Sequence, residues 1–424
     1  MRDISICIVG AGGSYTPEII EGILERDEDT LPVGELRLTD VNPGRLATME
    51  GLTRRMFAAR GRNISVWAEP DLAKAAKDTD FVIAQIRVGG MAARRIDETI
   101  PLKYGVIGQE TTGPGGMFKA LRTIPVMVGI ARTITDVAPN ATILNYTNPS
   151  GIVTEAVLNH SLAKFMGLCS SIPTMQDDMA RRLEPRFGVV RTYSVGLNHL
   201  GFIHRILANG IDVTADAIAW LSRLEGQPES YYRWMELARK LGAVPTLGYS
   251  NYYFHRGAAL AAQRAAAKTR AQQVMEIESE VLAEAADPNV NVKPAALAKR
   301  GGEGYSRVTF AILTAILHDR EDEVVMSTLN RGAVNGLPDA AAVEVTCRVD
   351  ASGADPLTVG DMPLAFRGLV QAVKAHESLT VEAAMTQSRE IALRALLAHP
   401  LVSDIEIAEP MLDELLAAHG LDYR

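Results

Sequence analysis

The sequence has few cysteines, few aromatic residues and no excess of positive charge, although it is 424 residues long. Its three cysteines, Cys7, Cys169 and Cys347, do not form the even set of a disulfide framework, which favours a reducing, cytoplasmic environment. The formal charge of −8 argues against nucleic acid and anionic membranes as partners, because both attract basic surfaces. No apolar run approaches the roughly 18 residues that a membrane-spanning helix requires. A small anion held by a few arginines is still compatible with this composition.

The first half of the chain contains a regular alternation of short apolar runs and helical patterns. The apolar runs predict strands over residues 4–9, 35–39, 64–68, 81–86, 141–146 and 165–169. The segments between them predict helices over residues 17–26, 43–59, 120–137 and 152–159. Because the runs lack polar alternation, they suit strands that are covered on both faces. The pattern therefore predicts an α/β fold with a Rossmann-like, doubly wound and mostly parallel sheet.

Beyond about residue 195 this alternation weakens, and long stretches rich in Ala, Leu and Glu follow. They predict helices over residues 260–286, 362–376, 381–397 and 410–419, with one strand over 343–349. We therefore expect a first domain over residues 1–195 and a C-terminal mixed α+β domain over residues 196–424.

The first apolar strand runs into a glycine turn and then a helix start. Gly10, Gly12, Gly13 and Ser14 form this turn, which would let the backbone approach the phosphates of a dinucleotide at a helix N-terminus. The third glycine of a GxGxxG fingerprint would fall on Tyr15, so the match is incomplete. A turn of this kind also occurs in proteins that bind no nucleotide.

A second feature strengthens the dinucleotide interpretation. Asp40 ends the next predicted strand, about 30 residues after Gly10, where an acid accepts hydrogen bonds from ribose hydroxyls and repels a 2′-phosphate. This favours NAD over NADP. Alternatively, Asp40 starts an Asp-Val-Asn-Pro turn and caps the following helix. The two roles are compatible.

Long ordered strings follow along almost the whole chain. They are QIRVGG (85–90), IPLKYG (100–105), GQETTGPGG (108–116), NYTNPS (145–150), GLNH (196–199) and RGG (300–302). With these strings the chain resembles glycoside hydrolase family four, whose members are glycosidases that depend on NAD and a divalent metal. The run over residues 87–116 is most similar to the 6-phospho-β-glucosidase branch of that family.

The resemblance implies glycoside cleavage through oxidation and elimination. NAD+ takes a hydride from C3 of the sugar, a base removes the C2 proton as the C1 substituent leaves, water adds, and the hydride returns. The implied cofactors are NAD+ and Mn2+ or another divalent metal, and the implied assembly is a homodimer or homotetramer. The first domain would bind NAD, and the second would hold substrate, metal and subunit contacts.

Two residues match the metal ligands of the family. They are Cys169, which ends an apolar run, and His199, in the GLNH string. A Lewis acid at this place would stabilise the ketone and the enediolate, with substrate hydroxyls completing its shell. Without the resemblance, such a cysteine is usually a core residue and such a histidine is usually structural.

For catalysis, the resemblance points to Tyr249 in the run YSNYY as the base at C2, with Tyr252 or Tyr253 as alternatives. A phenol is a poor base at neutral pH unless a metal or another cation stabilises its phenolate. Glu110 matches a group behind the metal site that supports the ligands or handles protons.

Substrate contacts are also implied by the resemblance. Arg87, Arg94 and Arg270 would face the sugar or its phosphate, because guanidinium groups bind phosphate with paired hydrogen bonds. Asn148 would bind a sugar hydroxyl. Each arginine is otherwise an ordinary exposed charge.

The match to the family breaks after the metal-binding cysteine. Family members usually carry Asp or Asn there, whereas this chain has Ser170 and one extra residue before the next proline. Ser170 would still contact substrate, but a non-phosphorylated or acidic glycoside becomes an alternative substrate. Two further alternatives are an NAD-dependent 2-hydroxy-acid dehydrogenase and a non-catalytic NAD-binding protein.

Overall fold

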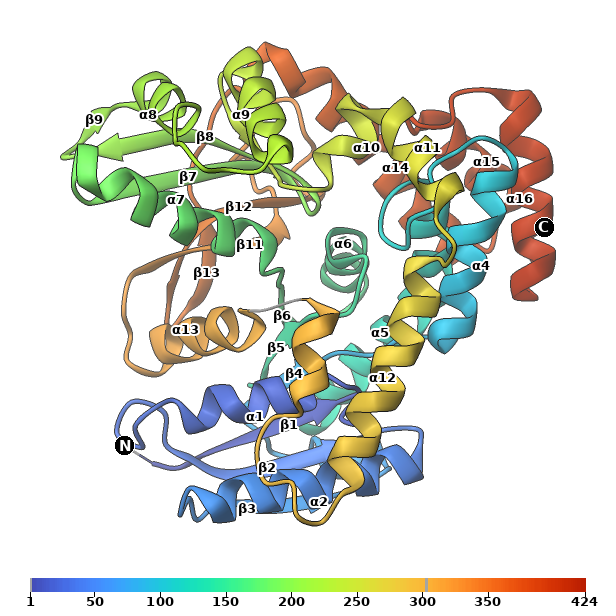
Figure 1. The fold of residues 1–424 in the computed structure, drawn as a ribbon. Coiled ribbons are helices and arrows are strands. Elements are labelled where there is room, and N and C mark those ends of the chain that lie inside the picture. Colours follow the sequence, from blue (N-terminus) through green and yellow to red (C-terminus); the bar gives the residue numbers. More distant parts are fainter. Residues whose placement is uncertain (1, 302–303) are drawn as a thin grey trace.

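The computed structural model describes residues 2–301 and 304–424, and its fold is shown in Figure 1. Gly302, the last residue of the RGG string, and Glu303 lie outside the described residues.

A nine-stranded sheet, in the order β13-β12-β11-β6-β5-β4-β1-β2-β3, forms the centre of the molecule. Its first six strands in the chain are β1 (Ile4–Val9), β2 (Val33–Thr39), β3 (Ser65–Ala68), β4 (Phe81–Ala84), β5 (Thr142–Asn145) and β6 (Lys164–Gly167). These six are parallel and stand in the order 3-2-1-4-5-6, which is the Rossmann order. The predicted Rossmann-like fold is thus confirmed, with each predicted strand present to within a few residues.

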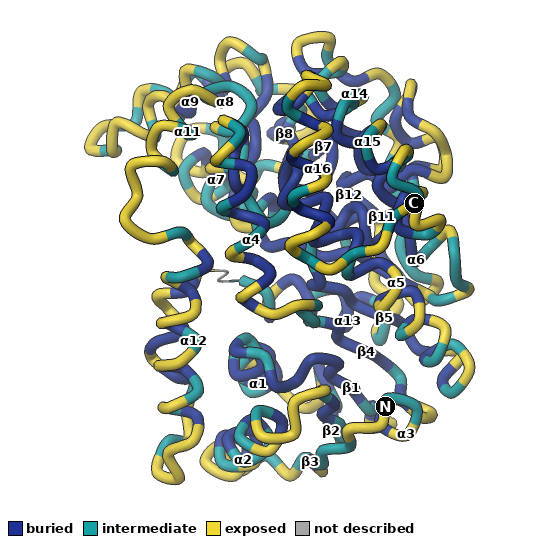
Figure 2. The backbone as a smooth tube through the Cα atoms, turned by 90° about the vertical axis from the view of Figure 1, so that its right-hand side faces the viewer, coloured by how far each residue is buried: buried dark blue, intermediate teal, exposed yellow. Residues whose placement is uncertain are grey.

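Both faces of the sheet are covered, which explains why its strands are apolar throughout. Ile6 and Ile8 of β1 pack with α1 (Thr16–Leu24) and α2 (Pro43–Ala59), whereas Cys7 and Val9 face the opposite side. That side is covered by α5 (Gly113–Val137), α6 (Ser150–His160) and the C-terminal helices. Figure 2 shows the sheet strands as buried, while the outer turns of the helices are exposed.

The second half of the chain contributes to two sheets, which bears out the expected mixed α+β character. The strands β11 (Asp322–Leu329), β12 (Ala342–Asp350) and β13 (Gly353–Pro356) extend the large sheet in antiparallel fashion. A separate antiparallel sheet contains β7 (Val190–Leu197), β8 (Leu200–Ala208), β9 (Ile211–Asp212) and β10 (Val244–Pro245). Residue 195 lies within β7, and the division of the chain at that residue stays a prediction.

The remaining helices position loops around the sheet edge. They are α3 (Leu72–Ala75), α4 (Gly90–Lys103), α7 (Ser171–Phe187), α8 (Thr214–Leu221), α9 (Glu229–Leu241), α10 (Ser250–Phe254), α11 (Arg256–Ala265), α12 (Arg270–Ala286), a 3-10 helix (Ala295–Arg300), α13 (Tyr305–Leu317), α14 (Leu364–Thr386), α15 (Arg389–Ala398) and α16 (Ile405–His419). In Figure 1, α12 runs from the helices around α10 and α11 down to α2.

Two predicted helix boundaries were wrong. The single helix expected over 260–286 is two helices, because Thr269 and Gln272 form a capping box that starts α12. Conversely, α14 continues through the gap expected after residue 376 and ends only at Gln387, which adopts a left-handed conformation with φ of +54°. Ser388 then caps α15.

Two general properties concern the described part of the chain. Its three cysteines are free and buried. No helix within residues 2–301 and 304–424 combines the length and the apolar character needed to cross a membrane.

The contact between α1 and α13 leaves no room for a side chain at Gly22. A Cβ atom added there would lie 2.4 Å from the Cβ of Ser306 and 2.7 Å from the ring of Phe310. We therefore expect Gly22→Ala to lower the free energy of unfolding by about 1–3 kcal/mol in urea denaturation. Gly368→Ala in α14 is the control, because no described atom lies within 4 Å of its added Cβ. Equal stability of Gly22→Ala and the wild type would contradict this packing.

Candidate active site

The carboxyl ends of β1, β2, β4, β5 and β6 surround one cavity of about 940 Å³. Doubly wound sheets bind ligands at this edge, at the point where the strand order reverses, which here lies between β1 and β4. The residues chosen from the sequence all line this cavity: Gly10, Gly12, Gly13, Ser14, Asp40, Arg87, Arg94, Glu110, Asn148, Cys169, Ser170, His199, Tyr249 and Arg270. Tertiary structure therefore brings the predicted residues together, while the role of each one stays a prediction.

The glycine turn is packed so closely that side chains do not fit. Gly10 has a φ of +85°, and a Cβ added to it would lie 2.9 Å from the carbonyl oxygen of Gln85. A Cβ on Gly12 would meet the Asp40 carboxylate at 2.9 Å, and one on Gly13 would meet the Gly10 carbonyl at 3.0 Å. Ser14 is 1% exposed at the start of α1. This bare backbone fits the close approach of a pyrophosphate.

Asp40 holds the turn from the next strand. Its Oδ2 accepts a hydrogen bond from the Gly12 N–H at 2.9 Å, and its Oδ1 accepts one from the Asn42 N–H at 2.8 Å. The predicted turn at Asp40 is present, but Asn42 caps α2 by accepting from the Arg45 N–H. Since Asp40 also lines the cavity, its structural role is compatible with a contact to ribose.

One end of the cavity is apolar. It is lined by Val41, Pro70, Leu72, Val126 and Ile130, which follow β2 and β3 or lie on α5. Val41 is fully exposed, and together with the other four residues it forms an apolar surface that fits an adenine ring. This apolar surface could not be predicted from the sequence, because the residues that form it come from separate elements.

At the other end, Cys169 and His199 face one another. Cys169 Sγ lies 3.6 Å from His199 Nε2, and both side chains are buried. One thiolate and one imidazole fit a divalent transition metal whose other positions are filled by oxygen atoms of substrate or water. Within the described residues, no group of three or more Cys, His, Asp or Glu side chains is arranged to hold a metal. The protein therefore offers a two-ligand, open site.

Each ligand is positioned by a different sheet. Cys169 follows β6, and its sulfur accepts from the Ser171 N–H at 3.4 Å and contacts the Ser171 hydroxyl at 3.3 Å, at the start of α7. His199 lies at the tip of the β7–β8 hairpin, where Leu197 pairs with Leu200. The start of α7 and the tip of this hairpin thus define the distance between the Cys169 sulfur and His199 Nε2.

The protein groups alone leave both ligands uncharged at neutral pH. Burial and the nearby Glu344 carboxyl raise the pKa of the Cys169 thiol to about 11. Burial and Lys119 lower the pKa of His199 to about 3. A divalent cation favours deprotonation of a coordinating thiol, so metal binding at this pair releases a proton.

Tyr249 is packed directly on His199, the candidate metal ligand. The rings of Tyr249 and His199 are stacked, with centroids 3.8 Å apart and an interplanar angle of 5°. Burial raises the pKa of the Tyr249 phenol, and the nearby Cys169 and Glu110 add to the rise. Tyr252 and Tyr253, the two alternatives, are not among the described residues that line the large cavity. The geometry therefore favours Tyr249 of the three.

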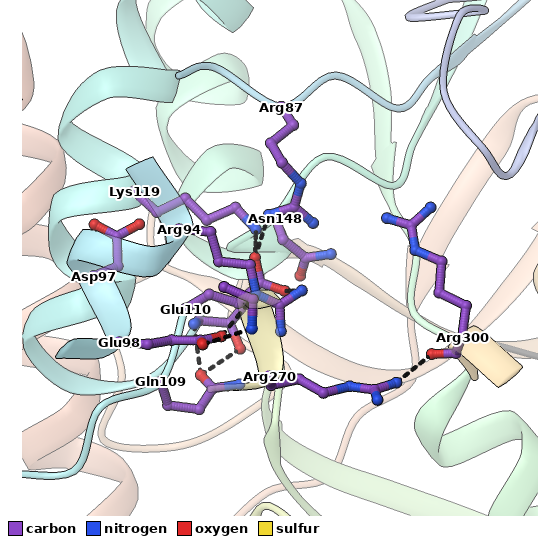
Figure 3. Close-up of polar contacts among 12 residues, drawn as sticks. Arg87, Arg94, Asp97, Glu98, Gln109, Glu110, Lys119, Asn148, Arg270 and Arg300 are labelled. Carbon is purple, nitrogen blue, oxygen red and sulfur yellow. Dashed lines mark hydrogen bonds and ion pairs between the residues drawn. The ribbon is translucent and has the colours of Figure 1, made fainter. Parts of the chain in front are cut away.

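Glu110 is the centre of a buried ion-pair cluster (Figure 3). Its carboxylate lies 2.9 Å from Arg94 Nη1 and 2.7 Å from Lys119 Nζ, and it also pairs with Arg87. Burial alone would raise the pKa of Glu110, but the three cations outweigh that effect and hold it well below its ordinary value. Glu110 is thus a permanent carboxylate, which suits support of neighbouring groups better than donation of a proton.

Arg270 and Arg300 form a second cationic region of the wall. Arg270 Nη2 donates to the Arg300 carbonyl oxygen at 2.7 Å (Figure 3), and the Arg300 guanidinium lies over the Tyr15 ring, 4.2 Å from its centroid. Glu98 accepts from Arg94 Nε at 2.7 Å and from the Ala271 N–H at 2.8 Å. The start of α12 is thereby tied to α4.

Two polar side chains complete the sugar end. Asn148 Nδ2 donates to the Tyr146 carbonyl at 3.1 Å, whereas Asn148 Oδ1 is buried and accepts no hydrogen bond from the described residues. This acceptor fits a sugar hydroxyl. Ser170 also lines the cavity, while its neighbour Ser171 contacts the Cys169 sulfur instead.

Two basic residues of the site, Lys119 and Arg300, were not predicted from the sequence. Lys119 is 3% exposed and lines the cavity, and burial together with Arg87 lowers its pKa to about 7. The sequence feature that indicates a buried role for Lys119 is its place within the otherwise apolar run 117–121. Arg300 belonged to the RGG string but received no role.

A Rossmann-type sheet with a glycine turn and a thiol–imidazole pair beside it defines a dinucleotide-dependent enzyme with a metal site. Residues 5–184 match the model of the family 4 glycosyl hydrolases, and residues 194–402 match the model of their C-terminal domain. The chain belongs to this family. It is therefore an NAD- and divalent-metal-dependent glycoside hydrolase, as predicted, and the dehydrogenase alternative was wrong.

Individual relatives agree with this assignment. The chain is 40% identical to the "Probable 6-phospho-beta-glucosidase" of Bacillus subtilis (strain 168), covering 99% of this chain and 97% of that protein. It is 34% identical to the 6-phospho-beta-glucosidase of Escherichia coli (strain K12), covering 99% and 96%. The solved 6-phospho-beta glucosidase of Thermotoga maritima with manganese, NAD+ and glucose-6-phosphate superposes with a TM-score of 0.88 at 32% identity, covering 98% of each chain.

The glycine turn makes a testable contribution to cofactor affinity. A methyl group on Gly12 would displace the Asp40 carboxylate, which lies 2.9 Å from the added Cβ. We expect Gly12→Ala to weaken NAD+ binding about tenfold by isothermal titration calorimetry, the cost of roughly one hydrogen bond. Gly44→Ala is the control, because the nearest described atom to its added Cβ is Asn42 Oδ1 at 3.6 Å. Unchanged NAD+ affinity in Gly12→Ala would show that the turn does not carry the cofactor.

Proposed function

We propose that this glycoside hydrolase acts on 6-phospho-β-glucosides. The observation that carries the proposal is the single cavity in which the glycine turn, the Cys169–His199 pair and two cationic regions meet. The proposal is supported by the two relatives at 40% and 34% identity, which are named as 6-phospho-β-glucosidases. It is also supported by the Thermotoga maritima structure with glucose-6-phosphate.

The residues of the cavity divide between two cofactors. Gly10, Gly12 and Gly13 would hold the pyrophosphate of NAD+, and Asp40 would bind its ribose. Cys169 and His199 would hold Mn2+ or another divalent metal. When bound, these groups supply a reversible hydride acceptor and a Lewis acid for the C2 and C3 oxygens of the sugar.

The side chains account for proton transfer and charge. Once C3 is a ketone, Tyr249 accepts the C2 proton while the C1–O bond breaks and its electron pair leaves with the aglycone oxygen, which takes up a proton. Addition of water would then place its hydroxyl at C1 and a proton at C2, and reduction of the ketone, with a hydride to C3 and a proton to its oxygen, would restore the alcohol. One water is consumed and one glycosidic bond is cleaved. The free Asn148 acceptor would orient a sugar hydroxyl, and the cations around Glu110 would stabilise negative charge that develops on the sugar oxygens.

Arg270 and Arg300 would bind the 6-phosphate. Both line the cavity, and Arg270 is directed toward Arg300 by the hydrogen bond to its carbonyl oxygen. Guanidinium groups suit a phosphate dianion because they donate paired hydrogen bonds to it. Ser170 would contact the sugar or the leaving group at the start of α7.

Assembly and location complete the proposal. We infer a homodimer or homotetramer in the cytoplasm, with a small-molecule glycoside as ligand rather than nucleic acid or membrane. The inference is supported by the three free cysteines and by α11, of whose described residues none is buried within the single chain.

The elimination route predicts exchange at C2. With p-nitrophenyl 6-phospho-β-glucoside, NAD+ and Mn2+ in D2O, we expect nitrophenol release together with deuterium at C2, measured by mass spectrometry. Tyr249→Phe keeps the ring stack but removes the base, so turnover and exchange should fall about 100-fold or more, with NAD+ affinity unchanged. Tyr232→Phe, an exposed tyrosine whose hydroxyl donates to the Leu224 carbonyl, is the control. Nitrophenol release without deuterium at C2 would exclude elimination.

The phosphate assignment predicts a selective loss of affinity. Arg270→Gln removes a charged donor, so we expect KM for the phosphorylated substrate to rise about 10- to 100-fold, with kcat less affected. Arg54→Gln on the exposed side of α2, where Arg54 pairs with Glu50, is the control. Equal kcat/KM of the wild type on phosphorylated and unphosphorylated glucosides would refute a phosphate site.

A further inference from the structure

The backbone of the metal-ligand hairpin has an unusual conformation. Asn198 and His199 are the two loop residues between β7 and β8, and His199 has a φ of +66°. Non-glycine residues rarely adopt this left-handed conformation, which persists where surrounding contacts hold it. The stack on Tyr249 is one such contact. A second contact comes from the side chain of Asn198.

Asn198 is anchored on the large sheet. Its Nδ2 donates to Glu344 Oε2 at 2.8 Å, and Glu344 is a 2% exposed residue near the start of β12. Two residues further along β12, Thr346 Oγ1 accepts from the Ser194 N–H of β7 at 3.1 Å. The two hydrogen bonds come from the same face of β12 and attach the β7–β8 hairpin to it.

Glu344 is also aligned across the large sheet with a residue of β6, the strand that precedes Cys169. It is opposite Ser327 on β11, and Ser327 is opposite Gly167 on β6, two residues before Cys169. The hydrogen-bonded backbone of three neighbouring strands therefore sets the position of Glu344 relative to Cys169.

We propose that Glu344 is a positioning residue for the metal site. It holds Asn198, and through Asn198 it presents His199 Nε2 to the Cys169 sulfur. Glu344 is not among the described residues that line the cavity, so it acts through Asn198 rather than on the substrate. The inference rests on the proposed function in one respect, which is that Cys169 and His199 bind a divalent metal.

The test measures metal affinity without turnover. The full chain is titrated with Co2+ alone, and the thiolate-to-cobalt charge-transfer band reports occupancy of the Cys169–His199 pair. Glu344→Ala and Asn198→Ala are each expected to weaken Co2+ binding about 10- to 100-fold, as is typical when an outer partner of a metal ligand is removed. The double variant should bind no more weakly than either single variant, since both remove the same hydrogen bond. Glu344→Gln keeps an acceptor for Asn198 and should bind Co2+ much more tightly than Glu344→Ala, which lacks one and equally lacks the carboxylate charge.

The control is Glu155→Gln on α6. Glu155 is a comparably buried carboxyl that pairs with Lys374 at 2.9 Å and accepts from the Ala342 N–H. The Co2+ affinity of the Glu155→Gln variant should equal that of the wild type. Thermal unfolding without metal verifies that each variant folds. Where Glu344→Ala does not fold, Asn198→Ala and Glu344→Gln complete the test.

Three results would overturn the positioning role. They are wild-type Co2+ affinity in both Asn198→Ala and Glu344→Ala, equal weakening in Glu344→Gln and Glu344→Ala, and equal weakening in Glu155→Gln. A wild-type protein with no thiolate-to-cobalt band would instead overturn the Cys169–His199 metal site, and with it this inference. The failure of the proposed function is therefore distinguishable from the failure of the positioning role.

Discussion

The packing of the β7–β8 hairpin against β12 is the constraint on which the site depends. Cys169 is carried by the end of the parallel sheet, whereas His199 is carried by the tip of a separate antiparallel hairpin. Their donor atoms lie 3.6 Å apart, and the hairpin is attached to β12 by hydrogen bonds from the Ser194 N–H to Thr346 and from Asn198 to Glu344. A small sliding of one sheet on the other would separate the thiol from the imidazole.

The cavity also depends on an uneven distribution of buried charge. Three cations surround the single carboxylate of Glu110, and Arg270 and Arg300 lie nearby on the wall. Buried cations are costly unless they are paired, and this site leaves more positive than negative charge facing the cavity. An anionic ligand would complete the pairing. The same positive charge, through Lys119, helps to keep His199 neutral and able to act as a metal ligand.

Ser170 and Ser171 form the start of α7, directly after Cys169. The family usually carries Asp or Asn next to the cysteine, and here Ser170 takes that place while Ser171 turns its N–H and hydroxyl toward the sulfur. The Ser171 N–H donates to the sulfur, and such a donor favours the thiolate form, as does the N-terminus of α7. Ser171 thus contacts the Cys169 sulfur, while Ser170 lines the cavity.

The parallel strands and the glycine turn with Asp40 could be predicted from the sequence alone. So could most of the candidate site residues, because they lie in strings typical of the family. These features rest on local periodicity, turn chemistry and residue identity, which short segments carry. The sequence did not determine that Lys119 joins the Glu110 cluster or that Asn198 is held by Glu344. Both features depend on which segments pack together in the folded chain. A buried charge such as Lys119 is stabilised by its spatial neighbours, and the β7–β8 hairpin is held by a strand that lies far from it in the sequence. Only the tertiary structure could place Cys169, His199 and Tyr249 in contact around one cavity.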